Sequence, residues 1–212
     1  MIRVNNVYYQ YPCSPTPVLK NYSASFAPGE ITALRGVNGC GKTTLTKLLA
    51  GILRPGQGTI HINNTDTSRL DLFEIGQSLG YVFQNPNRQL FCETVYQEVA
   101  FGLTNLKIPP EQIKEKTDYN LDYFGLSSYR DIFPGKLSHG EKQRLALAAV
   151  LALGTDYLVL DEPTTGLDVS RRGELGRILQ DLRDKHGCGI IVASHDEGFI
   201  SRYADSELVM EP

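Results

Sequence analysis

The sequence predicts an α/β protein whose core is interrupted by a helical insertion. β-like and helical segments alternate near both ends of the chain, which is the pattern of an α/β sheet protein. Residues 157–160 are all apolar, which is typical of a strand buried on both faces, as parallel strands are. Between about residues 86 and 153 the pattern is mostly helical, and we expect these residues to form the insertion.

The amino-terminal part begins with strands and reaches its first helix after a glycine-rich turn. Apolar residues at helical spacing predict a helix over residues 42–53, and Pro55 and Gly56 would end it. A polar loop with a short helical piece separates the last two strands of this part. The strands expected here are residues 2–9, 18–26, 31–34, 59–62 and 79–83.

The helical insertion and the carboxy-terminal part follow without a linker that would suggest a second domain. Proline or glycine breaks the helical pattern at residues 109–110, 125 and 134–135. After the buried strand, the alternating pattern continues with a helix, a strand, a short helix and a last strand. The helix is expected over residues 170–185, and the two strands over residues 189–193 and 207–210.

Composition and charge are those of an ordinary globular protein. Hydrophobic residues make up 41% and the net charge is −3, which argues against a nucleic-acid surface or an anionic-lipid surface. The first ten residues lack the basic and apolar regions of a signal peptide. The longest apolar run, residues 145–153, is far shorter than the roughly 20 residues that span a bilayer. We expect it to be a buried helix, so that any membrane role would come through a partner.

The segment 36–43 fits the phosphate-binding pattern GxxxxGK[ST] between a predicted strand and a predicted helix. Three glycines allow the backbone to wrap a phosphate chain with its N–H groups pointing inward. The helix N-terminus adds partial positive charge. Lys42 would reach the β- and γ-phosphates, and the Thr43 hydroxyl would ligate Mg²⁺. A chance glycine-rich turn is the alternative, and the flanking strand and helix argue against it.

Two acidic residues, Asp161 and Glu162, follow the apolar strand directly. A carboxylate at a strand end beside a phosphate loop can hold Mg²⁺, directly or through water, and a second one can activate the attacking water as a general base. Alone, the pair could be a solvated turn. Together with the phosphate loop, the pair favours the catalytic interpretation.

A second anion site is indicated at Ser138 and Gly140, directly before the apolar helix. A Ser hydroxyl and backbone N–H groups at a helix start can bind an anion. Ser138 with Glu141 three residues later also fits a capping box. Both interpretations can hold together, because capping leaves other amides free for a ligand.

Six motifs in order resemble those of the nucleotide-binding domains of ABC transporters, over essentially the whole chain. They are GVNGCGKT, Gln84, LSHGEKQR, LVLDEP, TTGLD and SHD. The resemblance implies an ABC ATPase fold, in which a RecA-like P-loop NTPase core carries an N-terminal antiparallel β-part and an inserted α-helical subdomain. Residues 1–212 would then be a single ATP-binding domain with the helical subdomain at about 86–153.

The resemblance also implies roles for individual residues. Tyr11 matches the aromatic residue that stacks on adenine, with Tyr8 and Tyr9 as alternatives. Gln84 matches the glutamine that touches Mg²⁺ and the attacking water, and Asp168 the residue that communicates across a dimer. The implied catalytic set is Glu162 as base, His195 as the switch that contacts the γ-phosphate, and Gln84. The implied metal ligands are Thr43, Gln84 and Asp161. The implied ATP-binding set is Tyr11, Gly36, Asn38, Gly39, Cys40, Gly41, Lys42, Thr43, Thr44, Ser138, Gly140 and Asp168.

The sequence departs from the family pattern at His139, where a glycine is usual. The backbone N–H remains, so phosphate binding need not be lost. A position that required a positive φ would strain a histidine, and an imidazole near phosphate could make activity pH-sensitive. We favour a tolerated side chain that points away.

The stretch FQNPNRQLF at residues 83–91 resembles the ATPases of energy-coupling-factor importers, including cobalt and nickel systems. That resemblance implies a Mg²⁺-dependent ATPase subunit that energises uptake of cobalt, nickel or a vitamin. Its partners would be a second ATPase subunit, identical or paralogous, a transmembrane coupling protein and a substrate-binding membrane subunit, with no nucleic acid. It would lie at the cytoplasmic face of the membrane. The alternatives are another class of ABC transporter, a soluble non-transport ABC ATPase and a P-loop kinase, and the last would not explain LSHGE or SHD.

Overall fold

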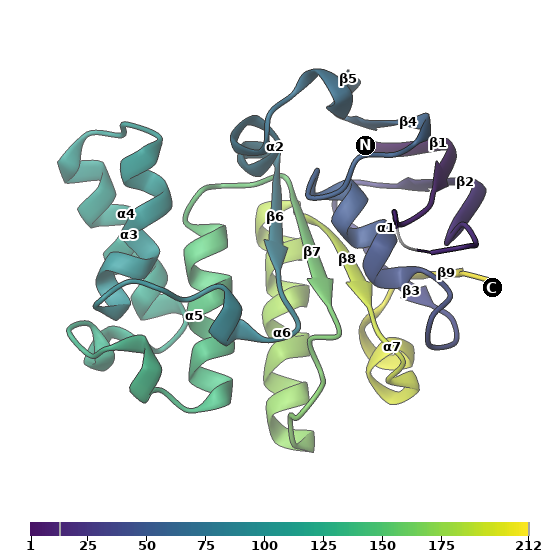
Figure 1. The fold of residues 1–212 in the computed structure, drawn as a ribbon. Coiled ribbons are helices and arrows are strands. Elements are labelled where there is room, and N and C mark those ends of the chain that lie inside the picture. The colour runs from purple at the N-terminus through teal and green to yellow at the C-terminus, as the bar shows by residue number, and fades with distance from the viewer. Residues whose placement is uncertain (13, 212) are drawn as a thin grey trace. The chain divides into compact units, whose positions relative to one another are not determined.

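The structure is a computed structural model that describes residues 1–12 and 14–211 (Figure 1). The chain forms two compact units. The first combines Met1–Tyr81 with the chain from Asp156 onward, and the second is Val82–Thr155. The first unit is thus interrupted once by the second.

An antiparallel sheet opens the first unit. Its strands are β1 (Ile2–Tyr9), β2 (Leu19–Phe26), β4 (Gln57–Ile62) and β5 (Thr65–Asp66), in the order β2-β1-β4-β5. In the central strand β1, Ile2 is paired with Phe26 on one side and with Ile62 on the other. All three of these residues are buried, so this sheet turns one apolar face to the core.

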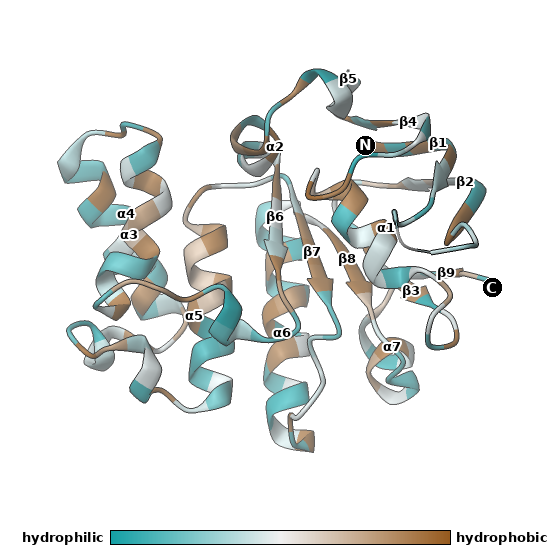
Figure 2. Ribbon diagram, viewed as in Figure 1, coloured by the Kyte–Doolittle hydropathy of each residue, from teal (hydrophilic) through white to brown (hydrophobic). Residues whose placement is uncertain are grey.

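A parallel sheet of five strands forms the centre of the first unit, in the order β6-β7-β8-β3-β9. Every residue of β7 and β8 is buried. Figure 2 shows both strands mostly in brown, the colour of hydrophobic residues, as expected for parallel strands covered on both faces. The strands are β3 (Ile31–Arg35), β6 (Leu79–Val82), β7 (Tyr157–Asp161), β8 (Gly189–Ala193) and β9 (Ser206–Val209).

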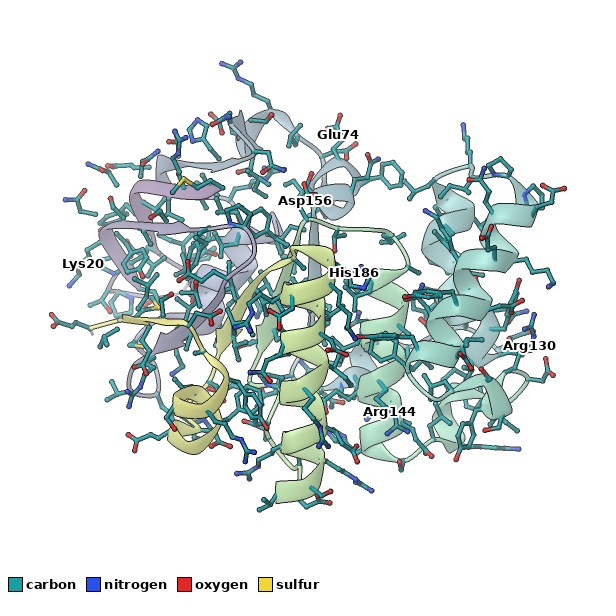
Figure 3. All side chains as sticks on the ribbon, turned by 180° about the vertical axis from the view of Figure 1, so that it is seen from behind. Lys20, Glu74, Arg130, Arg144, Asp156 and His186 are labelled. Atoms are coloured by element: carbon teal, nitrogen blue, oxygen red, sulfur yellow. The ribbon has the colours of Figure 1, made fainter. Side chains whose placement is uncertain are left out.

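Helices cover this parallel sheet. The helix α1 (Lys42–Leu49) contacts β7 and β8, and α6 (Val169–His186) contacts β3 and β8. Figure 3, viewed from behind, shows α6 in front of the sheet with His186 at its end. The buried residues of α6 include Leu175, Leu179 and Leu182, which share one helix face at spacings of three and four. The shorter helices α2 (Leu72–Ser78) and α7 (Glu197–Tyr203) complete the unit.

Two helix ends differ from the sequence expectation. The helix expected over residues 42–53 ends at Leu49, because Gly51 adopts a left-handed conformation with φ 70° that a right-handed helix cannot continue. That glycine also lies where a Cβ would be 2.4 Å from Ile75 Cδ1 of α2. The later helix runs to His186, one residue beyond the expected end, and Gly187 caps it with φ 63°.

The second unit is built on three helices, α3 (Val95–Asn105), α4 (Pro110–Tyr123) and α5 (His139–Leu151). The helix α3 packs against both α4 and α5. A short 3₁₀ turn at Pro86–Arg88 precedes α3, and two more, Ser127–Tyr129 and Pro134–Lys136, lie between α4 and α5. The predicted breaks are confirmed: Pro110 begins α4, Gly125 follows its end with φ 64°, and Pro134 begins the last turn.

The apolar run expected as a buried helix belongs to α5, where Leu145, Ala146, Leu147, Ala148 and Val150 are buried. In the part of the chain that the structure describes, no helix combines the length and the apolar character needed to cross a bilayer.

Candidate functional site

A glycine-rich loop joins β3 to α1 in the first unit. Gly36, Gly39 and Gly41 have φ of 151°, 87° and 104°, a region of backbone conformation that favours glycine. A Cβ at Gly36 would be 2.6 Å from the carbonyl oxygen of Met210. This loop therefore needs glycine both for its shape and for its fit against the end of β9.

Lys42, the first residue of α1, folds back over this loop. Its Nζ donates a hydrogen bond to the carbonyl of Gly36 at 2.7 Å and lies 3.4 Å from the carbonyl of Val37. The residue is buried, at 7% exposed. The ammonium group of Lys42 is held against the loop, and the amides of a helix start lie beside it. Together they can form a binding site for an anionic chain such as a polyphosphate.

Thr43 and Asp161 meet beside the loop. The Thr43 hydroxyl donates to Asp161 Oδ1 at 3.0 Å, although β7 and α1 are distant in sequence. Asp161 is buried at the end of β7, and this burial raises the pKa of its carboxyl, while hydrogen bonds from Thr43 and Tyr81 and the charges of Lys47 and Lys42 lower it. A hydroxyl and a carboxylate oxygen at this distance are ligands of the kind that Mg²⁺ prefers.

Glu162, the next residue, pairs with His195. Their side chains approach at 2.8 Å, between Glu162 Oε2 and His195 Nδ1. Glu162 has a left-handed backbone with φ 49°, and its N–H donates to the Ala193 carbonyl at 2.8 Å. A non-glycine residue held with positive φ beside reactive groups is typical of an active site. The pair places a carboxylate and an imidazole together at the ends of β7 and β8.

The three tyrosines near the start of the chain differ in burial and in their distance from the glycine-rich loop. Tyr9 is buried in the core of the first unit, whereas Tyr11 is partly buried and packs edge-on against Tyr9 with ring centroids 5.0 Å apart. The Tyr11 hydroxyl lies 3.2 Å from Thr44 Oγ1. Tyr11 therefore lies next to the glycine-rich loop, and Tyr8 is half-buried in β1.

The other expected residues of the first unit lie on the loop or at a helix start. Asn38 and Gly39 are exposed at the loop tip, while Cys40 is buried beneath it. Asp168 is the N-cap of α6, and its carboxylate accepts a hydrogen bond from the Arg171 N–H at 2.9 Å. The first unit thus brings together the glycine-rich loop, Tyr11, Asp161, Glu162 and His195. Asp168 lies at the end of the loop that joins β7 to α6.

Gln84, Ser138 and Gly140 belong to the second unit. Gln84 is exposed just before the first 3₁₀ turn. Ser138 caps α5 in a capping box with Glu141: the Ser138 N–H donates to Glu141 Oε2 at 2.7 Å, and the Glu141 N–H to Ser138 Oγ at 3.4 Å. His139 is the first residue of α5 and exposed, so it has a right-handed helical backbone and no strain from a positive φ.

Sequence reasoning missed two residues that support these groups. The hydroxyl of the partly buried Tyr81 lies 3.3 Å from Thr46 Oγ1 and donates toward Asp161 Oδ2 at 3.5 Å. Arg172 forms an ion pair with Asp196, the residue after His195, at 2.8 Å. Neither belongs to a motif with a fixed chemical role, so only the spatial arrangement identifies them.

Chemically, the first unit can hold a polyphosphate on a glycine-rich loop, supply oxygen ligands for a divalent cation, and place a carboxylate base beside an imidazole. These are the components that phosphoryl transfer to water requires, because its catalysis is mostly positioning and charge stabilisation.

Comparisons with known proteins show the family of the chain. The family model described as "ABC transporter" matches residues 19–165. An energy-coupling factor transporter ATP-binding protein, EcfA, of Methanothermobacter thermautotrophicus is 41% identical over 99% of this chain and 68% of its own length. The solved structure of cbiO1 from Clostridium perfringens, described as part of the ABC transporter complex cbiONQ, superposes with a TM-score of 0.90 at 37% identity, over 99% of this chain and 84% of that one. An ATP-binding cassette solved as a dimer in a post-hydrolysis state with ADP and Pi has a TM-score of 0.87 at 25% identity, over 100% of this chain and 94% of that one.

Proposed function

We infer the function of this chain from the premise that it belongs to the ABC transporter family of ATP-binding proteins. It is an ABC ATPase. We propose that it is the ATP-hydrolysing subunit of an energy-coupling-factor importer. The observation that carries the ATPase chemistry is the meeting of Lys42, Thr43 and Asp161 at one glycine-rich loop. Its likeness to EcfA and to cbiO1 supports the importer class.

ATP would bind with its phosphates on the loop 36–44. The backbone amides from Asn38 to Thr44, together with Lys42, would surround the phosphates. Lys42 lies against the loop. On ATP binding, its hydrogen bonds to the Gly36 and Val37 carbonyls would be replaced by hydrogen bonds to phosphate oxygens. Tyr11, beside Thr44, would stack on adenine.

The residues present fit Mg²⁺. Thr43 offers a hydroxyl at an exposed position, Asp161 offers a carboxylate 3.0 Å away, and Gln84 would add an amide oxygen. A bound Mg²⁺ would neutralise charge on the β- and γ-phosphates.

Hydrolysis would use the pair at the ends of β7 and β8. Glu162 would accept a proton from the attacking water as general base. His195, now 2.8 Å from Glu162, would hydrogen-bond the γ-phosphate, and Gln84 would orient the water. The contact with His195 would also orient the Glu162 carboxylate.

Two such chains, identical or paralogous, would enclose two ATP molecules. Ser138 and Gly140 of one chain would contact the γ-phosphate bound to the other, because the start of α5 presents free amides while Ser138 serves as its cap. Asp168 would take part in contact across this interface. The dimeric neighbour with bound ADP and Pi supports such a pairing.

The dimer would drive a membrane partner at the cytoplasmic face of the membrane. That partner would comprise a transmembrane coupling protein and a small membrane subunit that binds the substrate, a cobalt or nickel ion or a vitamin. The relative named as an energy-coupling factor ATPase and the neighbour from the cbiONQ complex support this assignment. Residues 1–212 would act as one ATP-binding domain with its helical part at about 86–153.

Replacement of the base tests the chemistry. We expect Glu162→Gln to bind ATP with unchanged affinity and to lower kcat by roughly 10²-fold or more, since general base catalysis typically contributes 10²–10⁴-fold. Glu115→Gln makes the same chemical change at an exposed position of α4 and should leave kcat unchanged. Near-normal turnover of Glu162→Gln in a phosphate-release assay would assign the base to another residue.

Capture of the closed state tests the transport role. Tagged Glu162→Gln would be expressed in its native cell, and membranes would be solubilised gently with Mg-ATP before mass spectrometry. We expect a polytopic coupling protein and a small integral membrane protein to co-purify. Ribosomal proteins, or no membrane protein, would contradict the importer assignment while leaving the ATPase chemistry intact.

A further inference from the structure

Arg172, in the first turn of α6, joins the two loops that follow β7 and β8. Its Nε donates to the carbonyl of Leu167 at 3.0 Å, and its Nη1 lies 2.8 Å from Asp196 Oδ2. Leu167 directly precedes Asp168, and Asp196 directly follows His195. The Arg172 guanidinium therefore links Leu167 to Asp196. These two residues adjoin Asp168, the proposed interface residue, and His195, the proposed γ-phosphate contact.

This pair differs from an ordinary surface ion pair. The Arg172 side chain is 42% exposed, but the Asp196 side chain is only 15% exposed, and the other oxygen of Asp196 accepts the Phe199 N–H at 3.0 Å. Charge-assisted bonds from a planar guanidinium to two partners are directional, so they define the relative position of both loops. The neighbouring Arg171, by contrast, reaches Asp168 at 3.6 Å with both side chains more than 45% exposed, which is a pair of little energetic value.

Other polar ties connect the same two loops. The buried Thr164 and Ser194 hydroxyls are 3.4 Å apart, and Ser194 Oγ accepts the Asp196 N–H at 3.1 Å. A cavity of about 440 Å³ lies among these residues, lined by Thr165 and Arg172 as well as His195. These hydrogen bonds and the Arg172–Asp196 ion pair connect the two loops beside this cavity.

We propose that Arg172 is a positioning residue that couples the loop after β7, residues 162–168, to the loop after β8, residues 194–196. This inference rests on the proposed function, because it assigns the coupling a consequence for ATP hydrolysis. A contact that Asp168 makes with a second chain would be transmitted through Leu167 and Arg172 to Asp196, and so to the position of His195. Arg172 itself touches neither ATP nor the reacting water in this scheme.

Kinetics of matched variants test the coupling. We expect Arg172→Gln to lower kcat by roughly 10- to 100-fold, because a small misplacement of a reacting group has effects of that order. KM and ATP affinity should stay within about two-fold of wild type, since the loop 36–44 is untouched. Asp196→Asn should cause a similar loss, and the double variant should be no slower than either single variant, because both remove the same link. Arg177→Gln, an exposed arginine of the same helix, is the control and should keep wild-type kcat.

Hydrogen–deuterium exchange gives a readout that does not depend on turnover. The amides of Asp196 and Phe199 should exchange faster in Arg172→Gln and Asp196→Asn than in wild type or Arg177→Gln. Unchanged exchange in Arg172→Gln, or losses of kcat that multiply in the double variant, would overturn the coupling. Absence of ATP turnover in wild type would instead contradict the proposed function, and the exchange result would still decide the role of Arg172.

Discussion

At the scale of single residues, the geometry of the phosphate loop depends on its first glycine. Gly36 has φ 151°, and a Cβ there would be 2.5 Å from Cys40 Sγ and 2.6 Å from the Met210 carbonyl. The carbonyl belongs to the backbone and cannot turn aside as a flexible side chain would. Gly36 is therefore required by packing, apart from its proposed role at a phosphate.

We predict that Gly36→Ala destabilises the chain by roughly 1–3 kcal/mol, the usual cost of overpacking, and weakens ATP binding because the loop must shift. Gly76→Ala is the matched control: Gly76 lies in α2, and a Cβ there would meet nothing within 4 Å. That change should raise stability by about 0.5–1 kcal/mol, because alanine favours the helix. Thermal unfolding and equilibrium ATP binding would measure both effects. Equal melting temperatures for the two variants would contradict this account.

Asp161 illustrates a conflict between stability and function. Burial raises the pKa of its carboxyl, so the ionised form is less favourable in the folded protein than in water. We predict that Asp161→Asn raises the free energy of unfolding of the nucleotide-free chain by on the order of 1 kcal/mol, and with it the melting temperature, as is common when a destabilising functional group is removed. The same variant should lose the ability of Mg²⁺ to strengthen ATP binding. A lower melting temperature would show that the hydrogen bonds of this carboxylate outweigh its burial.

At the scale of elements, capping boxes mark where three of the described helices begin. Capping boxes start α2 at Asp71 with Glu74, α3 at Thr94 with Gln97 and α5 at Ser138 with Glu141. Each box satisfies amides that a helix start leaves unpaired. Because these signals act over four residues, the start of α5 could be predicted from the sequence.

An ion-pair group stabilises the second unit at α4. The Asp118 carboxylate pairs with Arg130 and with Lys114, and the hydrogen bond from Arg130 is the main reason that the pKa of Asp118 lies below its usual value. A carboxyl whose pKa is lower in the folded state stabilises the fold above its unfolded pKa of about 4. This contribution is lost as the pH falls through the folded-state pKa.

We predict that Asp118→Asn lowers stability at pH 7 by less than about 1 kcal/mol, because the pair is partly exposed and screened by solvent. The difference from wild type should shrink as the pH falls below about 4, and also at high salt. Thermal unfolding between pH 3.5 and pH 7 would measure it. A difference that is independent of pH would assign the effect to packing rather than to charge.

At the scale of the whole molecule, the residues of the proposed site are divided between the two units. The loop, Asp161, Glu162 and His195 belong to the first, and Ser138, Gly140 and Gln84 belong to the second. In the proposed dimer, Ser138 and Gly140 act on ATP bound to another chain, so capping of α5 and contact with phosphate should be separable by mutation.

We predict that Ser138→Asp preserves the fold and abolishes the ATP-dependent dimer in a Glu162→Gln background. Aspartate is as good an N-cap as serine, so the melting temperature should change little. Its charge would repel the γ-phosphate of the opposite chain, while ATP binding to the single chain stays unchanged. Light scattering with ATP and a nucleotide-binding assay would separate these effects, and a dimer that persists would contradict the proposed contact.

The sequence by itself determined the local features of this protein. The order of strands and helices, the glycine-rich loop, the helix breaks at prolines and glycines and the cap at Ser138 all follow from signals that act over a few residues. The sequence predicted the ends of helices less accurately. At Gly51, for example, a glycine near a helix end can either continue the helix or adopt a left-handed conformation that ends it.

The tertiary structure alone decided which side chains meet. Thr43 and Asp161 are 118 residues apart in sequence, yet their side chains are in contact. Tyr81 contacts Asp161 and Arg172 contacts Asp196, although neither belongs to any of the six motifs. The physical reason is the strand order β6-β7-β8-β3-β9, which makes neighbours of segments that are far apart along the chain. Propensity and turn chemistry are local, whereas the contacts of a charged or hydroxyl side chain depend on which strand ends lie side by side.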